Sequence, residues 1–251
     1  MKSLIIIIIL ISPACLGRET GETEITTTKG IEVFQDQKYY LLKENVNIVT
    51  DTFELSSDLV KAYFNLDLYD IIKIESIGNS KMKTAEGMNA KGEKINLSME
   101  DEFIEIIGDN SSLIYNDIEM YSDDNIRINN MSGIFKIKGD NSELKTSSIH
   151  IFANSIDGKY ETINNINEIN ELFVEDNIES NIQTSKINMF SKRAVYIKKN
   201  NEIELYDNVK IIRDNEIVTG DYANIDTLKE SYKVSSKNSE KVKILIKKND
   251  E

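Results

Sequence analysis

The stretch NVNIVTD at residues 45–51 returns as NVKIIRD at residues 208–214. The correspondence continues without a gap, because LSSD at residues 55–58 matches VTGD at residues 218–221. Internal self-similarity of this kind indicates a repeat architecture, in which each copy is one supersecondary unit stacked on the next. The sequence therefore predicts an array of related units.

Weaker copies open with a Gly-Asn or Asp-Asn pair ahead of a strand-like segment. They begin at Asn79, Asn110 and Asn177. The spacing is regular: 34 residues separate Asn45 from Asn79, and 31 separate both Asn79 from Asn110 and Asn177 from Asn208. Matched spacing of this kind is not expected from a chain that is merely rich in Asn.

Each copy reads as a turn, a strand with an apolar residue at every second position, a second turn and a further strand. The further strand opens with Asp or Glu, as at residues 58–62, 93–97 and 221–225. Alternation at a period of two places the apolar residues on one face of a sheet and the polar residues on the other. A two-strand unit cannot bury that face alone, so the units must stack and share one core.

The composition suits a folded, acidic protein. Of 251 residues, 40% are hydrophobic, and 43 acidic against 30 basic residues give a net charge of −13. This charge argues against nucleic acid as a partner, since phosphate neutralisation needs a basic surface. With one Pro and 11 Gly, the turns must be formed mainly by Asn, Asp and Ser.

The N-terminus reads as a signal peptide over residues 1–14. Lys2 is followed by the apolar run of residues 4–11 and by the small residues Ser12-Pro13-Ala14. The run is shorter than the roughly 20 residues that a bilayer-spanning helix needs. Cleavage after Ala14 would expose Cys15, so ordinary cleavage and lipidation at Cys15 both remain open.

Five segments are predicted. The signal peptide is followed by a flexible lead-in at 15–30, β-repeats at 31–140, an irregular connection at 141–170 and further β-repeats at 171–248. Ile163, Ile166, Ile169 and Phe173 are spaced three or four apart, which is typical of a helix. A short helix or connecting loop is therefore expected at 163–173.

The chain resembles the OstA-like family of lipopolysaccharide-transport proteins. The likeness lies in EIELYDNV at 202–209, TGDYA at 219–223, SIGN at 76–79, AKGE at 90–93 and IIGDN at 106–110. It extends over about residues 40–240 and consists of a strand-and-turn rhythm. The resemblance implies an all-β fold, an elongated antiparallel β-jellyroll or β-taco built of stacked strand repeats.

The resemblance also implies a function: a periplasmic protein, without catalytic activity or cofactor, that shields lipopolysaccharide acyl chains in a hydrophobic β-groove during outer-membrane assembly. Its partners would be lipopolysaccharide and LptC-like and LptD-like bridge proteins at the inner and outer membranes. Head-to-tail self-association is predicted through the strands near Val33 and near residues 242–246. The candidate groove residues are Val46, Ile48, Val60, Ala62, Ile95, Leu97, Ile104, Ile106, Ile203, Leu205, Val209, Ile211, Ala223 and Ile225.

Two alternatives stay open. The chain could be an LptC-like or lipid-anchored component of the same bridge, for which Cys15 would be the attachment point. It could instead be a structural β-solenoid whose apolar residues pack against one another as a sealed core. Whether an acyl chain enters the array separates these alternatives.

The sequence supports no catalytic or metal site. His150 is the single histidine, and it is expected on a strand. Without a second His or a Cys in the folded body, a zinc site has too few ligands. The runs at 123–125 and 140–141 offer oxygen ligands for calcium, but they are better interpreted as turns.

Overall fold

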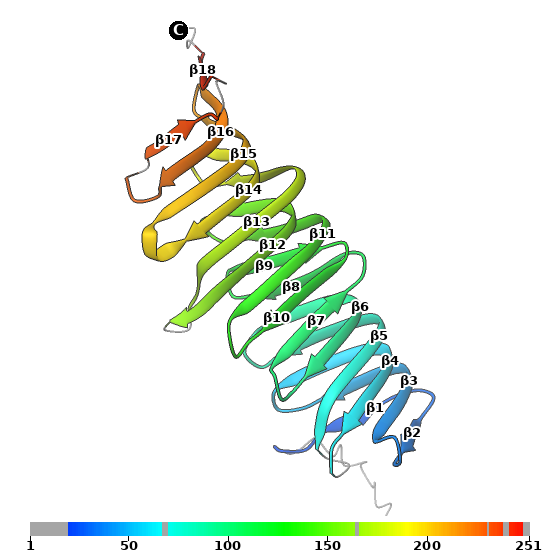
Figure 1. The fold of residues 1–251 in the computed structure, drawn as a ribbon. Coiled ribbons are helices and arrows are strands. Elements are labelled where there is room, and N and C mark those ends of the chain that lie inside the picture. The colour runs from blue at the N-terminus through cyan, green and yellow to red at the C-terminus, as the bar shows by residue number, and fades with distance from the viewer. Residues whose placement is uncertain (1–19, 67–69, 164–165, 230, 238–240, 248–251) are drawn as a thin grey trace, which may run out of the picture.

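The computed structural model describes residues 20–66, 70–163, 166–229, 231–237 and 241–247. The signal peptide and Cys15 lie outside the described residues. The predicted all-β class is confirmed, since antiparallel strands form one continuous sheet along an elongated molecule (Figure 1). The one helical segment in the described part is the short 3₁₀ turn η1 at Lys198–Asn200. No helix there is long and apolar enough to cross a membrane.

The long strands pair in chain order from one end of the molecule to the other. At the ends, β1 and β2 both pair with β3, and β17 and β18 both pair with β16. Near the middle, β7 and β8 together replace one long strand, as do β9 and β10. The strands are β1 Glu24–Thr26, β2 Ile31–Phe34, β3 Tyr39–Val49, β4 Phe53–Phe64, β5 Ile71–Thr84, β6 Asn89–Ser98, β7 Phe103–Ile107, β8 Ser111–Tyr115, β9 Ile118–Ser122, β10 Asn125–Asn129, β11 Ile134–Lys145, β12 His150–Ile163, β13 Ile166–Gln183, β14 Asn188–Ile197, β15 Glu202–Arg213, β16 Glu216–Asp226, β17 Ser231–Ser235 and β18 Lys243–Ile246.

The long strands bend near their middle. In β3 the pairing with β4 shifts between Lys43 and Val46, and in β15 the pairing with β16 shifts between Tyr206 and Val209. Such bulges bend a strand and re-aim its side chains. Because successive strands bend at corresponding points, the bends form a line, here called the seam, which divides the sheet into two layers.

The seam explains the repeat in the sequence. Residues 46–49 and 53–57 form a hairpin in one layer, layer A, and residues 59–64 and 71–77 form the next hairpin in the other, layer B. Each repeat is therefore one hairpin per layer. The turns predicted at Asn45 and Asn208 are instead kinks within long strands, where both residues are left-handed, with φ of 49° and 58°.

A column of buried serines follows the inner side of the seam. Ser57 donates hydrogen bonds to the carbonyl oxygens of Ile77 (3.0 Å) and Gly78 (3.1 Å), and Ser180 donates to that of Ser191 (2.7 Å). A bulge releases backbone groups from the strand ladder, and a buried group of that kind must find another partner. The seam serines Ser57, Ser76, Ser80, Ser111, Ser122, Ser142, Ser180 and Ser191 serve this role.

The space between the layers is filled by apolar side chains. Alternation turns Val46, Ile48, Val60 and Ala62 inward, whereas the residues between them face outward. The buried residues form one hydrophobic cluster that runs from Leu42 to Ile225. The continuous core predicted from stacking is therefore present in the described part of the chain.

Three expectations on organisation differ from the structure. Residues 141–145, 150–163 and 166–170 lie in β11, β12 and β13 of the same sheet, and residues 146–149 are the hairpin turn between β11 and β12. The segment is therefore not an irregular connection. Ile163 and Ile166 are a cross-strand pair at the end of the β12–β13 hairpin; the described part of 163–173 is strand rather than helix. In addition, β1 and β2 begin inside or directly after the segment predicted as a flexible lead-in.

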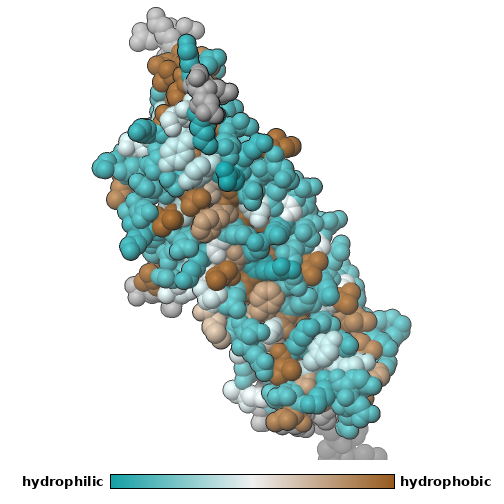
Figure 2. Space-filling model, in the orientation of Figure 1, coloured by the Kyte–Doolittle hydropathy of each residue, from teal (hydrophilic) through white to brown (hydrophobic). Residues whose placement is uncertain are grey.

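The face seen in Figure 2 is mostly hydrophilic, with separate hydrophobic patches, one of them at the C-terminal end. In the described part of the chain, β2 pairs with β3 alone and β18 pairs with β16 alone. Val33 and Ile244 on these strands are about half exposed, at 47% and 52%. Both ends of the stack therefore present apolar edge strands.

Candidate functional site

Opposite the seam, the hairpin turns of the two layers face each other as two rims, with a mouth between them. Rim A carries the turns at 50–52, 85–88, 116–117, 146–149, 184–187 and 214–215. Rim B carries the turns between β4 and β5 (described at 65–66 and 70), at 99–102, at 130–133, between β12 and β13, at 198–201 and at 227–229. Interstrand pairs lie within a layer on either side of the seam, so no strand ladder joins rim A to rim B among the described residues.

Three hollows lie in sequence along the mouth. The first, of about 560 Å³, is bordered by Glu86 and Tyr115 of layer A and by Tyr160 of layer B. The second, of about 430 Å³, is the central hollow, and the third, of about 190 Å³, shares Ile203 and Thr227 with it. Each hollow is lined from both rims, which makes the mouth a discontinuous cleft above the apolar interior.

The fourteen candidate groove residues all lie in the buried core. The structure brings them together as predicted from alternation, since each belongs to the one hydrophobic cluster. Their exposed fractions do not exceed 7%, so their side chains contact one another and the inner face holds no open channel at these positions. Of the fourteen, only Ile203 and Ile225 border a hollow of the mouth.

Apart from Ile203 and Ile225, the residues that line the mouth were not among the candidates. They are half-buried apolar and aromatic side chains packed against the edge of the core, including Tyr115, Ile149, Ile169 and Tyr196. Each occupies an inward position close to a hairpin turn. The signal that could have found them in the sequence is the inward apolar residue next to each turn, on either side of it.

Tyr160 shows that the rims are close enough to interact. Burial first, and then the charges of Tyr115 from the opposite layer, Glu102 and Glu86, together raise the pKa of its phenol to about 12. Its hydroxyl donates a hydrogen bond to Asn130 Oδ1 on its own rim (3.2 Å). The first hollow is therefore polar and acidic, and it favours a neutral phenol over a phenolate.

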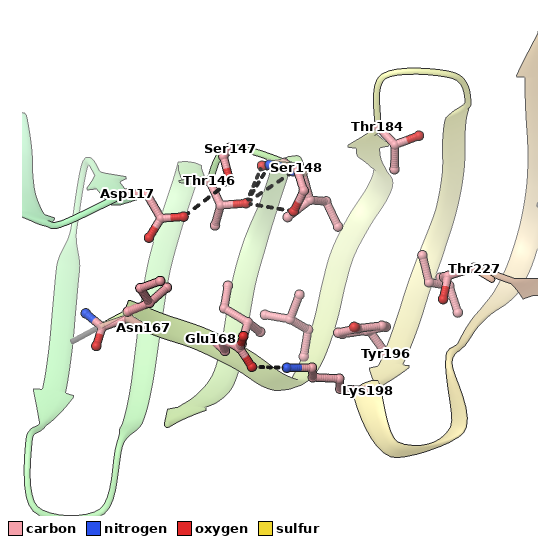
Figure 3. A pocket seen from close by; sticks show the side chains of 15 residues that line it. Asp117, Thr146, Ser147, Ser148, Asn167, Glu168, Thr184, Tyr196, Lys198 and Thr227 are labelled. Carbon is pink, nitrogen blue, oxygen red and sulfur yellow. Dashed lines mark hydrogen bonds and ion pairs between the residues drawn. The ribbon is translucent and has the colours of Figure 1, made fainter. Parts of the chain in front are cut away.

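The central hollow has polar edges and an apolar floor. Figure 3 shows the turn Thr146–Ser148 on one side and Glu168 and Lys198 on the other. Ser147 donates a hydrogen bond to Asp117 Oδ2 (3.3 Å) within rim A, while Lys198 forms an ion pair with Glu168 within rim B. These polar contacts organise each rim separately.

The floor of the central hollow is formed by apolar side chains from both layers. Ile149 contributes from layer A, and Ile169 and Leu172 contribute from β13 in layer B. Tyr196 of β14 closes one side, and burial raises the pKa of its phenol. An apolar body with a few polar groups is the usual chemistry of a small-molecule site.

One polar group in the central hollow has no partner. Asn167 is 4% exposed and lines the hollow. Its Oδ1 accepts a hydrogen bond from Thr162 Oγ1 (2.7 Å), but its Nδ2 has no hydrogen-bond partner among the described residues. Little in the sequence indicated this group, because Asn167 lies in an Asn-rich segment that was expected to be a helix or a loop.

The other residues singled out in the sequence, His150 and the Asp-Asn runs, make contacts within the fold. His150 begins β12, as predicted, and its Nε2 lies 2.5 Å from Glu143 Oε1. Asp123 is a seam residue whose carboxylate accepts hydrogen bonds from the backbone and side-chain amides of Asn141. Within the described ranges, no three His, Cys, Asp or Glu residues gather as a metal-binding group.

Comparisons with known proteins give a likeness in structure but none in sequence. No protein-family model matches the chain, and no curated protein matches its sequence. Among solved structures, the chain is similar to LptH of Pseudomonas aeruginosa, described as the LptA-homologous periplasmic component of the conserved lipopolysaccharide transport device. The match covers 52% of this chain and 95% of LptH, with 13% identity and a TM-score of 0.44. At these values the likeness assigns no family, and function must be inferred from the mouth and the interior.

Proposed function

We propose that the protein is a periplasmic carrier of lipopolysaccharide that holds acyl chains between its two layers. The observation that carries the proposal is the combination of a continuous apolar interior with a mouth lined by half-buried apolar side chains. The sequence resemblance to the OstA-like family agrees with this proposal. Export of the chain and its localisation between the membranes are parts of the same proposal.

The mouth can open because the two layers are joined along the seam. Moving rim A away from rim B bends the sheet at its bulges and leaves the interstrand ladders within each layer intact. The side chains that this movement separates are apolar, and an acyl chain between them would restore an apolar environment. Burial of acyl chain stabilises the complex by about 0.8 kcal/mol per methylene.

The ends of the stack suit partners with complementary strands. An exposed edge strand offers unpaired backbone groups to another chain, and strand addition is a recurrent mode of recognition. We propose that β2 and β18 are the ends through which the protein joins a second copy or related bridge proteins. A head-to-tail contact of this kind does not close on itself and produces a linear assembly.

A sealed structural stack is the second candidate. It is favoured by the burial of all fourteen candidate groove residues. In that case the layers would never part, and the mouth would be only the surface between two rows of turns. The two candidates differ in whether the protein binds lipid at all.

Binding of fluorescent lipopolysaccharide to mouth variants tests the proposal. The double substitution Ile149→Glu and Ile169→Glu places charges on both sides of the central hollow, so it should weaken binding by about tenfold or more. The matched control is the double substitution Ile178→Glu and Phe173→Glu, at side chains that are 81% and 49% exposed. This control variant should bind lipopolysaccharide as the wild type does. Absence of binding by the wild-type protein, or equal binding by both double variants, would favour the sealed stack.

A further inference from the structure

The β12–β13 hairpin reaches the central hollow because of a bulge. Lys159 pairs with Glu171, but the next residue, Tyr160, pairs with Ile169, so Asn170 is an extra residue in β13. The bulge resets the alternation, with the result that Asn167 and Ile169 on one side of it and Leu172 on the other all line the hollow. Asn167 thereby takes an inward position that the other strands give to apolar residues.

The side chain of Asn167 is costly to the unliganded protein. A buried donor without a partner destabilises a folded protein, because it has lost its hydrogen bonds to water and gained none in return. Because the Thr162 hydroxyl engages Oδ1, the amide is anchored and Nδ2 is left as the free group. The structure therefore maintains an anchored donor at the border of a hollow with polar edges and an apolar floor.

Asn167 differs from the other buried polar atoms without partners. In the described part of the chain these are Asn96 Oδ1, Asp157 Oδ1 and Asn181 Oδ1. All three are acceptors, and their residues alternate with buried ones on the outer faces of strands. Among these four atoms Asn167 Nδ2 is the donor, and its residue lines the central hollow of the mouth.

We infer that the central hollow is a subsite for the carbonyl end of an acyl chain. Asn167 Nδ2 donates a hydrogen bond to the carbonyl oxygen of an acyl amide or ester, and the chain beyond it lies against Ile149, Ile169 and Leu172. This inference rests on the proposed function, because it requires that acyl chains enter the mouth. It adds a fixed polar anchor to a site otherwise held by apolar contact.

The volume and charges of the hollow agree with a neutral carbonyl ligand. About 430 Å³ falls within the range of roughly 300–1,000 Å³ that small-molecule sites occupy. Lys198 is already paired with Glu168, and Asp117 on the opposite rim adds negative charge. A free carboxylate is therefore a poorer ligand here than an uncharged amide or ester.

The test compares two amphiphiles of equal chain length by calorimetry below their micelle concentrations. N-decanoyl-N-methylglucamine carries a carbonyl next to its chain, whereas n-decyl glucoside carries only a weakly accepting ether oxygen. The variant is Asn167→Leu, which removes the donor at similar size. The control is Asn181→Leu, on the outer face of the same strand.

Asn167→Leu should bind the decanoyl amide about tenfold more weakly than the wild type, which is the loss of one hydrogen bond, with little change for the decyl glucoside. Asn181→Leu should bind both as the wild type does. The thermal midpoint of unliganded Asn167→Leu should not fall, since an unpaired buried donor is removed. Equal affinity of wild type and Asn167→Leu for the amide would overturn the subsite but leave the carrier standing. Failure of the wild-type protein to bind either amphiphile would overturn both.

Discussion

The Oγ atoms of Ser57 and Ser80 lie 3.1 Å apart at the seam, although the two residues belong to different strands. Ser76 joins them, because its hydroxyl donates to Ser80 Oγ (2.9 Å) and to the carbonyl oxygen of Ile95 (3.0 Å). The three hydroxyls form a buried chain that supplies the hydrogen bonds which the bulges remove from the ladders. The fold of the sheet into two layers thus depends on small polar side chains placed where the strands bend.

Removing a seam hydroxyl should destabilise the protein. Ser57→Ala leaves the carbonyls of Ile77 and Gly78 without their buried donor, so the free energy of unfolding should fall by about 1–3 kcal/mol. Urea denaturation followed by circular dichroism measures this as a lower midpoint. Ser112→Ala, on the outer face of β8, is the control and should change stability by less than about 0.5 kcal/mol. Equal midpoints for the two variants would contradict the role of the seam serines.

Left-handed backbone at the seam should select for Asn or Gly. Asn208 has φ of 58°, a conformation that costs an ordinary L-residue about 1–2 kcal/mol. We expect Asn208→Ala to lower the thermal midpoint and Asn208→Gly to preserve or raise it. Asn188→Ala, at an exposed strand position, provides the comparison. If Asn208→Gly were as destabilising as Asn208→Ala, the left-handed backbone would not explain why position 208 holds Asn.

Tyr206 and Tyr222 share the carboxylate of Glu204 on the outer face of layer B. Both phenols donate hydrogen bonds to Glu204, and these bonds lower the pKa of its carboxyl; the bond from Tyr222 has the larger effect and that from Tyr206 the smaller. In turn, the hydrogen bond to Glu204 raises the pKa of Tyr206 to about 12, and burial contributes less to this shift. A raised folded-state pKa contributes stability below the ordinary tyrosine pKa of about 10, and that contribution is lost as pH rises through 12. The lowered Glu204 pKa contributes stability above about pH 4.5, which is lost as pH falls through the folded value.

Ultraviolet difference titration against Tyr206→Phe isolates the Tyr206 phenol. Glu204→Gln should move its pKa down toward the ordinary value, because a neutral amide replaces the charged acceptor. The control, Glu171→Gln, should leave the titration unchanged. An unaltered Tyr206 pKa in Glu204→Gln would show that the carboxylate is not its main determinant.

Self-association should depend on the edge strands. Val33→Lys places a charge on β2, and charged edge residues discourage strand addition. Sedimentation equilibrium at high protein concentration should show weak association of the wild type and its loss in Val33→Lys. The matched control is Ile178→Lys, which lies 81% exposed on β13 in the interior of the stack. A wild-type protein that stays monomeric, or association that survives Val33→Lys, would contradict the proposed end-to-end contact.

Much of the fold was predictable because the alternation is local. The inward positions of Val46, Ile48, Val209 and Ile211 follow from a period of two, and each is buried. The seam was misread, since a left-handed Asn followed by a strand looks the same in sequence whether it begins a hairpin or bends a long strand. Only the pairing of residues on both sides of Asn45 with the single strand β4 distinguishes the two.

The candidate site was less predictable. The bulge at Asn170 places Ile169 and Leu172 three residues apart on the same face, which imitates the spacing of a helix. Because the sequence does not show the bulge, alternation alone does not assign Asn167 to the inner face. The mouth itself depends on how two layers meet, and that relationship is tertiary.

Photocrosslinking from two adjacent residues of β14 can detect acyl chains between the two layers. A photoreactive phenylalanine replaces Tyr196, which lines the central hollow, or Val195, which faces outward opposite Phe173. Both variants are produced in cells that contain labelled lipopolysaccharide, and their folding is checked by thermal melting. We expect lipopolysaccharide adducts from position 196 and none from position 195. Folded protein that gives no adduct from position 196, or equal adducts from both positions, would contradict the account.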